Sequence, residues 1–385
     1  MMKVGIIGSG AMGSGIAQVA AFAGHEVHVY DANPIQAQVA AENLKKSFEK
    51  LVEKSKCTKE KMNEVLSNIF FQSNIENLSE SGIIIEAIVE DLDIKKEVFE
   101  ALESVVSADC ILATNTSSLS VSAIASACKN SKRFIGIHFF NPAPIMPLVE
   151  IIPALQTSED TINRSLELIK SWAKTTVLCK DTPGFIVNRV ARSFYGEAIR
   201  IYEEGIANIA TIDWAMKEIG GFKMGPFELM DFIGHDVNYK VTEIVWAQFF
   251  YDPRFKPSLT QKRLYEAKRF GRKSGIGFYD YAEGAVNVEV VKDKELAERI
   301  FARIISMLIN EAIDTLYLNV ASRDDIDSAM TKGVNYPKGL LAWADELGLG
   351  TVLENLETLM EQYEEDRYRP SVLLKQMVRE NKHFY

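Results

Sequence analysis

The sequence has few residues that could hold a metal ion or form a disulfide framework. It contains only four cysteines, Cys57, Cys110, Cys128 and Cys179. They lie far apart, and no two have the spacing of a CxxC pair or of a metal site. We therefore expect reduced, mostly buried thiols, no bound metal and a cytoplasmic protein.

Long apolar runs and an excess of positive charge are also missing. No apolar run reaches the roughly 18 residues that a membrane-spanning helix needs, and MMKVGIIGSG lacks the layout of a signal peptide. The 43 basic and 53 acidic side chains give a formal net charge of −10, which argues against nucleic-acid or membrane-surface binding. The 385 residues, 47% hydrophobic and 25% charged, exceed one ordinary core and fit two or three domains.

The N-terminal residues predict a strand, a glycine-rich turn, a helix and a second strand. The turn is Gly8-Ser9-Gly10-Ala11-Met12-Gly13, which has GxGxxG spacing. Gly8 permits a tight turn, Gly10 lets the backbone approach a pyrophosphate, and Gly13 lets helix and strand pack closely. The N-terminus of the helix would face the anion. The pattern predicts a dinucleotide site in which residues 8–13, Ala11 and Met12 included, contact the cofactor.

Asp31 ends the second strand, EVHVYD, 18 residues after Gly13. An acid at this position accepts hydrogen bonds from the adenosine ribose hydroxyls. Ala32 and Asn33 follow, and neither is the cation that a 2′-phosphate would need, so NAD is favoured over NADP. Asp31 could also cap the helix expected from Pro34, an interpretation compatible with the cofactor role.

Strand and helix patterns alternate as far as residue 182. This alternation predicts an α/β Rossmann-type domain with a mostly parallel sheet and helices on both faces. Polar residues fall at or just beyond the predicted carboxyl ends of strands, where such sheets bind ligands. They include Glu90, Lys95 and Asn115-Thr116-Ser117-Ser118.

Residues 35–56 are expected to form one lysine-rich helix. Lys46, Lys50 and Lys54 recur every four residues, and Ser47 borders this stripe. In an acidic protein the stripe could attract an anion such as a nucleotide 3′-phosphate. A solvated helix face explains the same pattern, because glutamates are mixed in, and spacing alone favours that interpretation.

Residues 133–150, RFIGIHFFNPAPIMPLVE, contain two apolar runs joined by a proline-rich connection. His138 lies near the end of the first run, and Glu150 lies inside the second. If both runs are strands, the carboxylate can return beside the imidazole, fix its tautomer and direct proton exchange to the other ring nitrogen. A solvated histidine and a strand-edge glutamate fit the spacing equally well.

After residue 182 the pattern becomes helical, and the C-terminal third repeats it. A shift of 114 residues superposes residues 197–199 on 311–313 and pairs further identical residues. These pairs include Asp213/Asp327, Gly225/Gly339, Asp231/Asp345 and Gly234/Gly348. We expect a duplicated helical domain, with domains at 1–182, 183–284 and 285–385.

Two polar residues of the helical region are candidate ligand contacts. Asn188 lies within a predicted helix, where asparagine is a mediocre helix former, so its amide indicates either a hydrogen-bonding role or solvent exposure. Its counterpart in the second copy is Ala302. Lys273 lies in a glycine-rich turn at residues 271–281.

Over residues 3–281 the chain resembles the L-3-hydroxyacyl-CoA dehydrogenase family. The most specific motifs are TNTSSLS at 114–120, HFFNPAPIMPLVE at 138–150 and DTPGFIVNR at 181–189. The resemblance implies a Rossmann domain that binds NAD and a helical domain that closes over an acyl-CoA. It also implies reversible oxidation of (S)-3-hydroxyacyl-CoA to 3-ketoacyl-CoA, in fatty-acid β-oxidation or a related pathway.

The same resemblance implies roles for individual residues. His138 is the expected acid–base and Glu150 its orienting carboxylate. Ser117 and Asn188 are the expected pair that positions the substrate oxygens. Expected NAD contacts are Glu90, Lys95, Ser117, Asn141 and Lys273, and expected coenzyme A contacts are Ser47, Lys54 and Ser117.

The second helical copy departs from single-unit family members. It resembles the doubled helical domain of the multifunctional fatty-oxidation enzymes and of some phenylacetate-pathway dehydrogenases. Because single-unit members pair their helical domains in a dimer, we expect an internal pseudo-dimer here, with homodimerisation of the whole chain left open. Two alternatives are a dehydrogenase of a free hydroxy acid or sugar acid, similar to L-gulonate dehydrogenases, and a crystallin-like NAD-binding protein without turnover.

Overall fold

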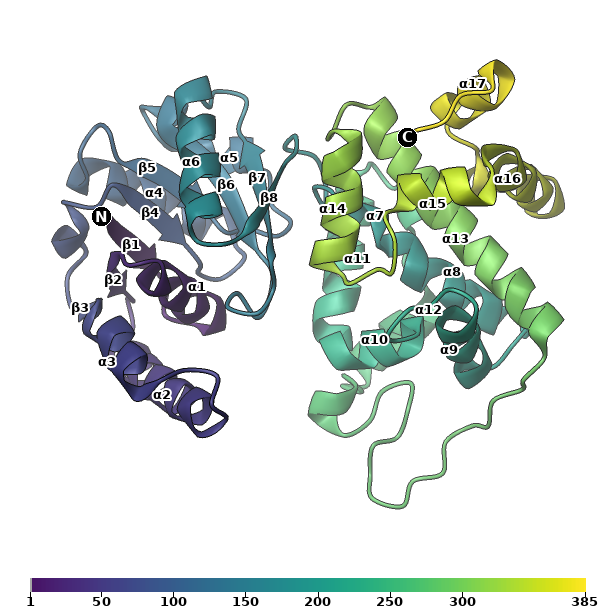
Figure 1. Ribbon diagram of the computed structural model, residues 1–385, viewed down its shortest axis with the longest axis horizontal. Coiled ribbons are helices and arrows are strands. Elements are labelled where there is room, and N and C mark those ends of the chain that lie inside the picture. Colours follow the sequence, from purple (N-terminus) through teal and green to yellow (C-terminus); the bar gives the residue numbers. More distant parts are fainter. Residues whose placement is uncertain (1) are drawn as a thin grey trace. The chain divides into compact units, whose positions relative to one another are not determined.

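The computed structural model describes residues 2–385 and divides the chain into two compact units, Met1–Thr182 and Pro183–Tyr385 (Figure 1). The first is an α/β unit and the second is built from helices, which confirms the expected fold class. The further boundary expected between residues 284 and 285 lies inside the second unit and stays a prediction.

An eight-stranded sheet forms the centre of the first unit, in the order β3-β2-β1-β4-β5-β6-β7-β8. Neighbouring strands are parallel, except that β6 and β7 are antiparallel. The strands are β1 (Lys3–Ile7), β2 (Glu26–Tyr30), β3 (Ile69–Gln72), β4 (Ile83–Glu86), β5 (Ile111–Thr114), β6 (Phe134–Phe139), β7 (Leu148–Pro153) and β8 (Thr175–Leu178).

Helices lie on both faces of this sheet (Figure 1). They are α1 (Ala11–Phe22), α2 (Pro34–Glu53), α3 (Lys59–Ser67), α4 (Leu92–Val105), α5 (Val121–Ala125) and α6 (Glu159–Ser171), with 3-10 turns at Ile75–Leu78 and Ser131–Arg133. On one face, Ile16 of α1 and Ile169 of α6 share a core with Ile137 of β6. On the other, the rings of Phe99 in α4 and Phe134 in β6 lie 4.6 Å apart. Burial on both faces explains the strongly apolar strands.

The start of α2 corrects one interpretation of the sequence. Asn33, and not Asp31, caps this helix, because the Asn33 side chain accepts hydrogen bonds from the backbone N–H groups of Ile35 and Gln36. The helix ends at Glu53, three residues before the expected position 56. Asp31 thus has no capping role that would compete with a cofactor.

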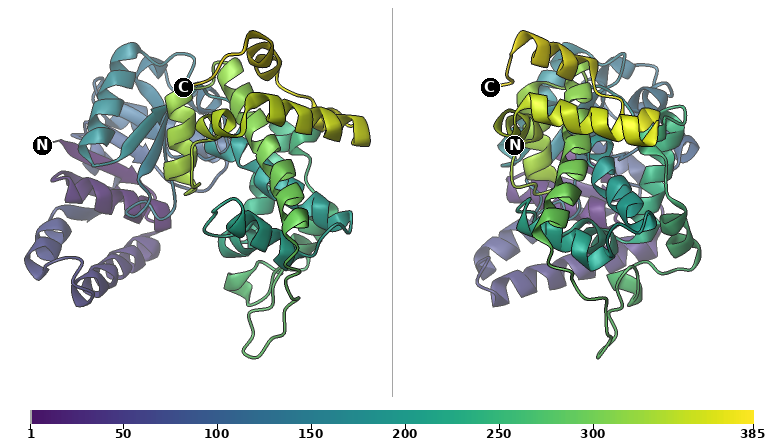
Figure 2. Two further views of the ribbon diagram at one scale, coloured as in Figure 1. Left: turned by 45° about the vertical axis from the view of Figure 1, so that its right-hand side comes forward. Right: turned by 90° about the vertical axis from the view of Figure 1, so that its right-hand side faces the viewer.

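The second unit is helical throughout. Its helices are α7 (Val187–Val190), α8 (Arg192–Glu203), α9 (Ile209–Glu218), α10 (Pro226–Ile233), α11 (His235–Gln248), α12 (Leu259–Glu266), α13 (Lys294–Tyr317), α14 (Arg323–Gly333), α15 (Leu340–Leu347), α16 (Leu349–Tyr363) and α17 (Val372–Glu380). Short 3-10 turns occur at Pro253–Phe255, Arg272–Ser274 and Asp366–Tyr368. The long helix α13 packs against α8 and α9 on one side and against α16 and α17 on the other (Figure 2).

The helix expected to run through Asn188 is broken at Ala191 into α7 and α8. The Ala191 N–H still bonds to the carbonyl of Val187, but the Phe194 N–H bonds to the carbonyl of Ala191. This change from four-residue to three-residue hydrogen bonds tightens the chain at the junction. Asn188 therefore lies on a separate single-turn helix.

The two halves of the helical unit repeat the same internal contacts. Asp213 accepts hydrogen bonds from the backbone N–H groups of residues 227 and 228, and Asp327 accepts them from residues 341 and 342, each 114 residues later. The Tyr279 hydroxyl donates to Asp213 at 2.7 Å, and the Tyr385 hydroxyl donates to Asp327 at 3.2 Å. In each half, a tyrosine hydroxyl from the end of the segment thus donates a hydrogen bond to a buried aspartate.

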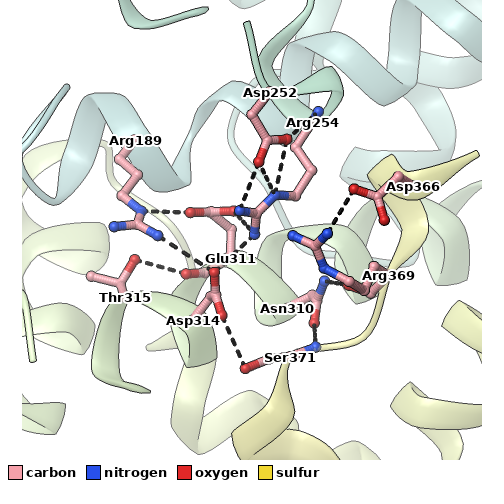
Figure 3. Close-up of polar contacts among 10 residues, drawn as sticks. All are labelled: Arg189, Asp252, Arg254, Asn310, Glu311, Asp314, Thr315, Asp366, Arg369 and Ser371. Carbon is pink, nitrogen blue, oxygen red and sulfur yellow. Dashed lines mark hydrogen bonds and ion pairs between the residues drawn. The ribbon is translucent and has the colours of Figure 1, made fainter. Parts of the chain in front are cut away.

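Two reciprocal ion pairs connect the halves. Arg189 donates from Nε to Glu311 at 2.5 Å, and Arg303 donates from Nε to Glu197 at 2.9 Å. The shift of 114 residues that relates Glu197 to Glu311 also relates Arg189 to Arg303. Figure 3 shows the first pair and its extension, in which Arg254 also points toward Glu311. Contacts of this kind, with each partner's residues exchanged, are typical of a twofold interface.

Within residues 2–385, no helix is long and apolar enough to cross a membrane. The four cysteines are free thiols, three of them buried and Cys57 half-buried. No group of three or more histidine, cysteine, aspartate or glutamate side chains in the described chain is arranged to hold a metal ion.

We expect Gly339→Ala to lower the free energy of unfolding by about 1–3 kcal/mol, because the added methyl group would overlap the Asp327 side chain. Gly350→Ala in α16 is the matched control, since its methyl group would meet no atom within 4 Å and alanine favours helix by up to about 1 kcal/mol. Urea unfolding of both variants measures the difference. Equal stability of the two would contradict the tight packing at Gly339.

Candidate active site

Polar residues of the first unit gather at one edge of the sheet. Because β1, β2, β4, β5 and β6 run parallel, their carboxyl ends meet there. The residues that follow or end these strands are the turn at 8–13, Asp31, Glu90, Ser117 and His138. This is the ligand edge expected from the sequence.

The glycine-rich turn has the shape that a dinucleotide phosphate requires. Gly8 has a φ of +95°, which disfavours a side chain. A methyl group at Gly13 would collide with the carbonyl oxygen of Gly8, whereas one at Gly10 would meet nothing within 4 Å. Helix α1 begins after Gly10 without a side-chain cap. Its first N–H groups are therefore suited to an anion.

Asp31 is a fixed carboxylate beside this turn. It accepts hydrogen bonds from the Ser9 N–H and hydroxyl, both at 2.7 Å, and from the Asn33 N–H at 2.9 Å. Burial acts to raise the pKa of Asp31, but these donors outweigh it and hold the pKa below its usual value. The group stays ionised and can accept ribose hydroxyls.

Glu90 organises the turn that follows β5. Its Oε1 accepts hydrogen bonds from the Thr116 hydroxyl at 2.6 Å and from the backbone N–H groups of Ser117 and Ser118 at 2.9 and 3.1 Å. Burial acts to raise the pKa of Glu90, but Lys95 and these donors outweigh it and lower the pKa. The charge on Glu90 therefore stabilises the position of Ser117.

Lys95 lies in a buried ion pair, at 1% exposure. Its Nζ contacts Glu86 at 2.6 Å and Glu90 at 3.4 Å. Glu86, the last residue of β4, also accepts from the Thr114 hydroxyl at 2.7 Å. The ammonium group of Lys95 thus helps to hold the Glu90 carboxylate in place. A direct contact between Lys95 and NAD stays a prediction.

His138 and Glu150 lie directly opposite each other in the antiparallel pair of β6 and β7. The imidazole Nδ1 is 2.7 Å from Glu150 Oε2, and the two residues are 5% and 0% exposed. The ring of Phe140 lies 4.5 Å from the imidazole. The side chain of Asn115 accepts a hydrogen bond from the Phe139 N–H at 2.8 Å, which ties the Ser117 turn to β6. A buried imidazole held by a carboxylate is equipped for proton transfer.

The remaining candidate residues lie on other elements of the two units. Ser47 and Lys54 are exposed, on α2 and at its end, and Asn141 is exposed just after β6. In the helical unit, Asn188 is half-buried on α7. Lys273 is 2.7 Å from Asp236 in that unit.

Sequence reasoning did not predict the roles of three residues that form buried ion pairs, Glu86, Arg189 and Glu311. Glu86 had a signal, since an acid that ends an otherwise apolar strand needs a partner, and here that partner is Lys95. Arg189 and Glu311 had a weaker signal, because both recur at the offset of 114 residues. Only the structure shows that they contact each other.

NAD fits the turn at residues 8–13 and the ionised Asp31, and both share the sheet edge with the His138–Glu150 pair. A dinucleotide-binding turn on the same sheet edge as a buried histidine–carboxylate pair is typical of NAD-dependent dehydrogenases. More specifically, the chain belongs to the 3-hydroxyacyl-CoA dehydrogenase family. The family description "3-hydroxyacyl-CoA dehydrogenase, NAD binding domain" matches residues 3–182, and "3-hydroxyacyl-CoA dehydrogenase, C-terminal domain" matches residues 184–281 and 300–383. The resemblance inferred from the motifs is confirmed, and the chain is an NAD-dependent oxidoreductase of hydroxyacyl-CoA thioesters.

Individual relatives agree with this assignment. The chain is 37% identical to the 3-hydroxyadipyl-CoA dehydrogenase of Escherichia coli K12, over 98% of this chain and 97% of the relative. It is 42% identical to a 3-hydroxybutyryl-CoA dehydrogenase of Clostridioides difficile, over 73% of this chain and 99% of the relative. The crystal structure of a 3-hydroxybutyryl-CoA dehydrogenase from E. coli K12 superposes with a TM-score of 0.91 at 36% identity, covering 97% of this chain and 98% of that one.

Replacing Glu90 with glutamine keeps an acceptor oxygen but removes the charge beside Lys95. We expect the free energy of unfolding near pH 7 to fall by about 1–2 kcal/mol. The folded-state pKa of Glu90 lies below its ordinary value of 4.5. The stabilisation is therefore present above that pH and disappears as the pH falls through the lowered pKa. Urea unfolding of wild type and variant between pH 7 and the lowered pKa measures the difference in their free energies of unfolding. A difference that does not change with pH would contradict the role of the charge.

Proposed function

We propose that this chain oxidises the 3-hydroxyl group of a 3-hydroxyacyl-CoA to a ketone, with His138 as the acid–base. The observation that carries the proposal is the 2.7 Å contact between buried His138 and buried Glu150 at the ligand edge of the sheet. When bound, NAD supplies the nicotinamide ring that accepts the hydride from C3. The reaction is reversible, and the same two residues serve both directions.

His138 and Glu150 divide the proton chemistry between them. The Nδ1–H of His138 donates to the carboxylate, which assigns proton exchange with the 3-hydroxyl to Nε2. As the proton arrives, the imidazole becomes cationic, and the adjacent carboxylate stabilises that charge. Burial strengthens this attraction because the surrounding dielectric is low. Such general-base assistance typically contributes about 10²–10⁴ in rate.

Other residues of both units position the ligands in this proposal. Ser117, held by Glu90, and Asn188, on α7, bind the oxygens around the reacting carbon. The proposed NAD contacts are Gly8, Gly10, Ala11, Met12, Gly13, Asp31, Glu90, Lys95, Ser117, Asn141 and Lys273. Ser47, Lys54 and Ser117 are the proposed coenzyme A contacts, and the exposed lysines of α2 suit its phosphates.

The C-terminal half of the helical unit acts as the second member of an internal pseudo-dimer, residues 285–385 against 183–284. The reciprocal pairs of Arg189 with Glu311 and Arg303 with Glu197 support this arrangement. The two stretches matched by the C-terminal family description support it as well. Glu311 holds Arg189, the neighbour of Asn188, so the second copy also steadies the single-turn helix α7. Homodimerisation of the whole chain is left open.

The family defines the substrate as a 3-hydroxyacyl-CoA, and relatives differ in the acyl group that their names give. One relative that spans the full chain is named for 3-hydroxyadipyl-CoA, whose acyl chain ends in a carboxylate. Relatives named for 3-hydroxybutyryl-CoA, whose acyl chain ends in a methyl group, include one that matches 73% of this chain and one that matches 97% of it. Both kinds of thioester are candidate substrates of this chain, and the free thiols suit a cytoplasmic enzyme.

We expect His138→Gln to lower kcat by about 10²–10⁴, because the proton acceptor is lost. Glutamine is of similar size, so folding and NAD binding should survive, as fluorescence titration with NADH would measure. Glu150→Gln should also lose activity, because the imidazole loses its orienting charge. More than about a tenth of wild-type turnover in His138→Gln, or an unchanged pH–rate profile in Glu150→Gln, would count against the pairing.

Glu311→Gln and Glu197→Gln form a matched pair for testing the second copy. Each removes the charge from one of the two reciprocal ion pairs. Each should lower the free energy of unfolding by about 1–3 kcal/mol. Only Glu311 holds the neighbour of Asn188, so only Glu311→Gln should lower kcat/KM, by roughly tenfold, equal to about 1.4 kcal/mol. Equal kinetic effects in the two variants would contradict the support of α7 by the second copy.

A further inference from the structure

Arg192, the first residue of α8, is buried without a carboxylate partner among residues 2–385. It is 7% exposed. Three other arginines of the helical unit are buried to a similar degree, and each pairs with a glutamate. These pairs are Arg189–Glu311, Arg303–Glu197 and Arg367–Glu365. A buried cation without a counter-ion is costly, and burial accordingly lowers the pKa of Arg192. Arg192 is the exception that requires an explanation.

Neutral groups fix the direction of the Arg192 side chain. Its Nε donates to the backbone carbonyl of Asn188 at 3.0 Å, and its Nη1 donates to the Thr242 hydroxyl at 3.1 Å. The guanidinium also lies over the ring of Tyr195, 4.9 Å from its centroid. Nη2 makes no hydrogen bond within the described chain. The group is therefore held in place with one donor nitrogen left for an acceptor.

Arg192 lines a cavity of about 430 Å³ inside the helical unit. The wall includes a face of α8 together with Thr242 of α11 and Gln261 of α12, and it carries charges of both signs, with four basic side chains and the three glutamates Glu203, Glu204 and Glu365. A cavity of this size falls in the range of small-molecule sites. Close by, the side-chain N–H group of Asn238 is buried without a hydrogen-bond partner in the described chain. Its backbone carbonyl accepts from Arg192 at 3.4 Å. A buried donor without a partner beside a buried cation suits a ligand that carries an acceptor group.

Arg192 occurs only in the half that carries Asn188. At the offset of 114 residues, Asn188 corresponds to Ala302 and Arg192 to Ser306. The reciprocal arginines Arg189 and Arg303, by contrast, are present in both halves. A purely structural arginine would be expected in both copies of the repeat. Its absence from the second copy associates Arg192 with the ligand proposed for Asn188.

We propose that Arg192 binds the distal carboxylate of the acyl chain and so selects thioesters of dicarboxylic acids. This inference rests on the proposed function, in which Asn188 contacts the oxygens at the reacting carbon. In a six-carbon dicarboxylic chain the carboxylate carbon lies three bonds beyond C3, or roughly 4 Å, since each bond is about 1.5 Å long. One helical turn rises about 5.4 Å, and Arg192 lies one turn after Asn188 with its guanidinium directed back toward it.

The test compares 3-hydroxyadipyl-CoA with 3-hydroxyhexanoyl-CoA, which have acyl chains of equal length and differ in the distal carboxylate. We expect the wild-type enzyme to favour the adipyl thioester in kcat/KM by about tenfold or more, the value of one charged hydrogen bond. This comparison needs no variant, so it holds whether or not substitutions at Arg192 fold. Equal or better use of the hexanoyl thioester would overturn the inference and leave the proposed function standing. Turnover of neither thioester would overturn both.

The Arg192→Met variant tests whether Arg192 causes the preference for the adipyl thioester. It should lose about 10- to 100-fold in kcat/KM on the adipyl thioester and less than about threefold on the hexanoyl thioester. The control, Lys256→Met, removes an exposed cation from the same cavity wall and should change neither substrate by more than about threefold. Equal losses on both thioesters in Arg192→Met would identify a structural role and overturn the inference.

Free adipate distinguishes a substrate tail from a separate carboxylate ligand. Added to wild-type enzyme that is oxidising 3-hydroxyhexanoyl-CoA, adipate should at most compete weakly with the thioester. A change in kcat at saturating thioester would mean that the two bind at the same time. Arg192 would then hold an independent carboxylate, and the assignment to the acyl chain would be overturned.

Discussion

A fully buried carboxylate, Glu150, is the constraint on which the sheet edge depends. An ionised carboxylate removed from water is costly unless a charge or hydrogen bonds compensate it. The antiparallel pairing of β6 and β7 places His138 directly opposite, although every other pair in the sheet is parallel. The neighbouring turn is tied to the same strand through Asn115 and is held by Glu90. The His138–Glu150 pair and the Ser117 turn are thus connected through hydrogen bonds.

The helical unit compensates its buried charges in a different way. There the partners come from halves more than 100 residues apart, as in the pair of Arg189 with Glu311 (Figure 3). Breaking such a pair leaves an uncompensated buried charge, so the two halves are held in one register. Arg254 and Asp314 extend this network to the segment before α12. The arrangement of the two halves therefore depends on long-range ion pairs as well as on apolar packing.

Sequence patterns predicted the parts of this protein that are local. The strand–turn–helix at Gly8–Gly13 and the repeat at Asp213 and Asp327 follow from spacing, because each is specified within a short segment. The break at Ala191 was missed, since both sides have the same helical periodicity and the change is only from four-residue to three-residue hydrogen bonds. Asp31 was considered as a possible cap of α2, whereas Asn33 caps this helix. Lys95 was expected to contact NAD, and that contact stays a prediction. Its ion pair with buried Glu86 was missed, because it depends on how α4 packs against the end of β4.

The reciprocal ion pairs have a consequence for how the two helical copies can differ. In a homodimer every substitution appears in both subunits, so a residue needed at one position is fixed at its symmetry mate as well. Here the two copies are separate stretches of one chain. Asparagine and arginine can therefore occupy positions 188 and 192 while alanine and serine occupy 302 and 306. Because association within one chain does not depend on protein concentration, the asymmetric arrangement persists at any dilution.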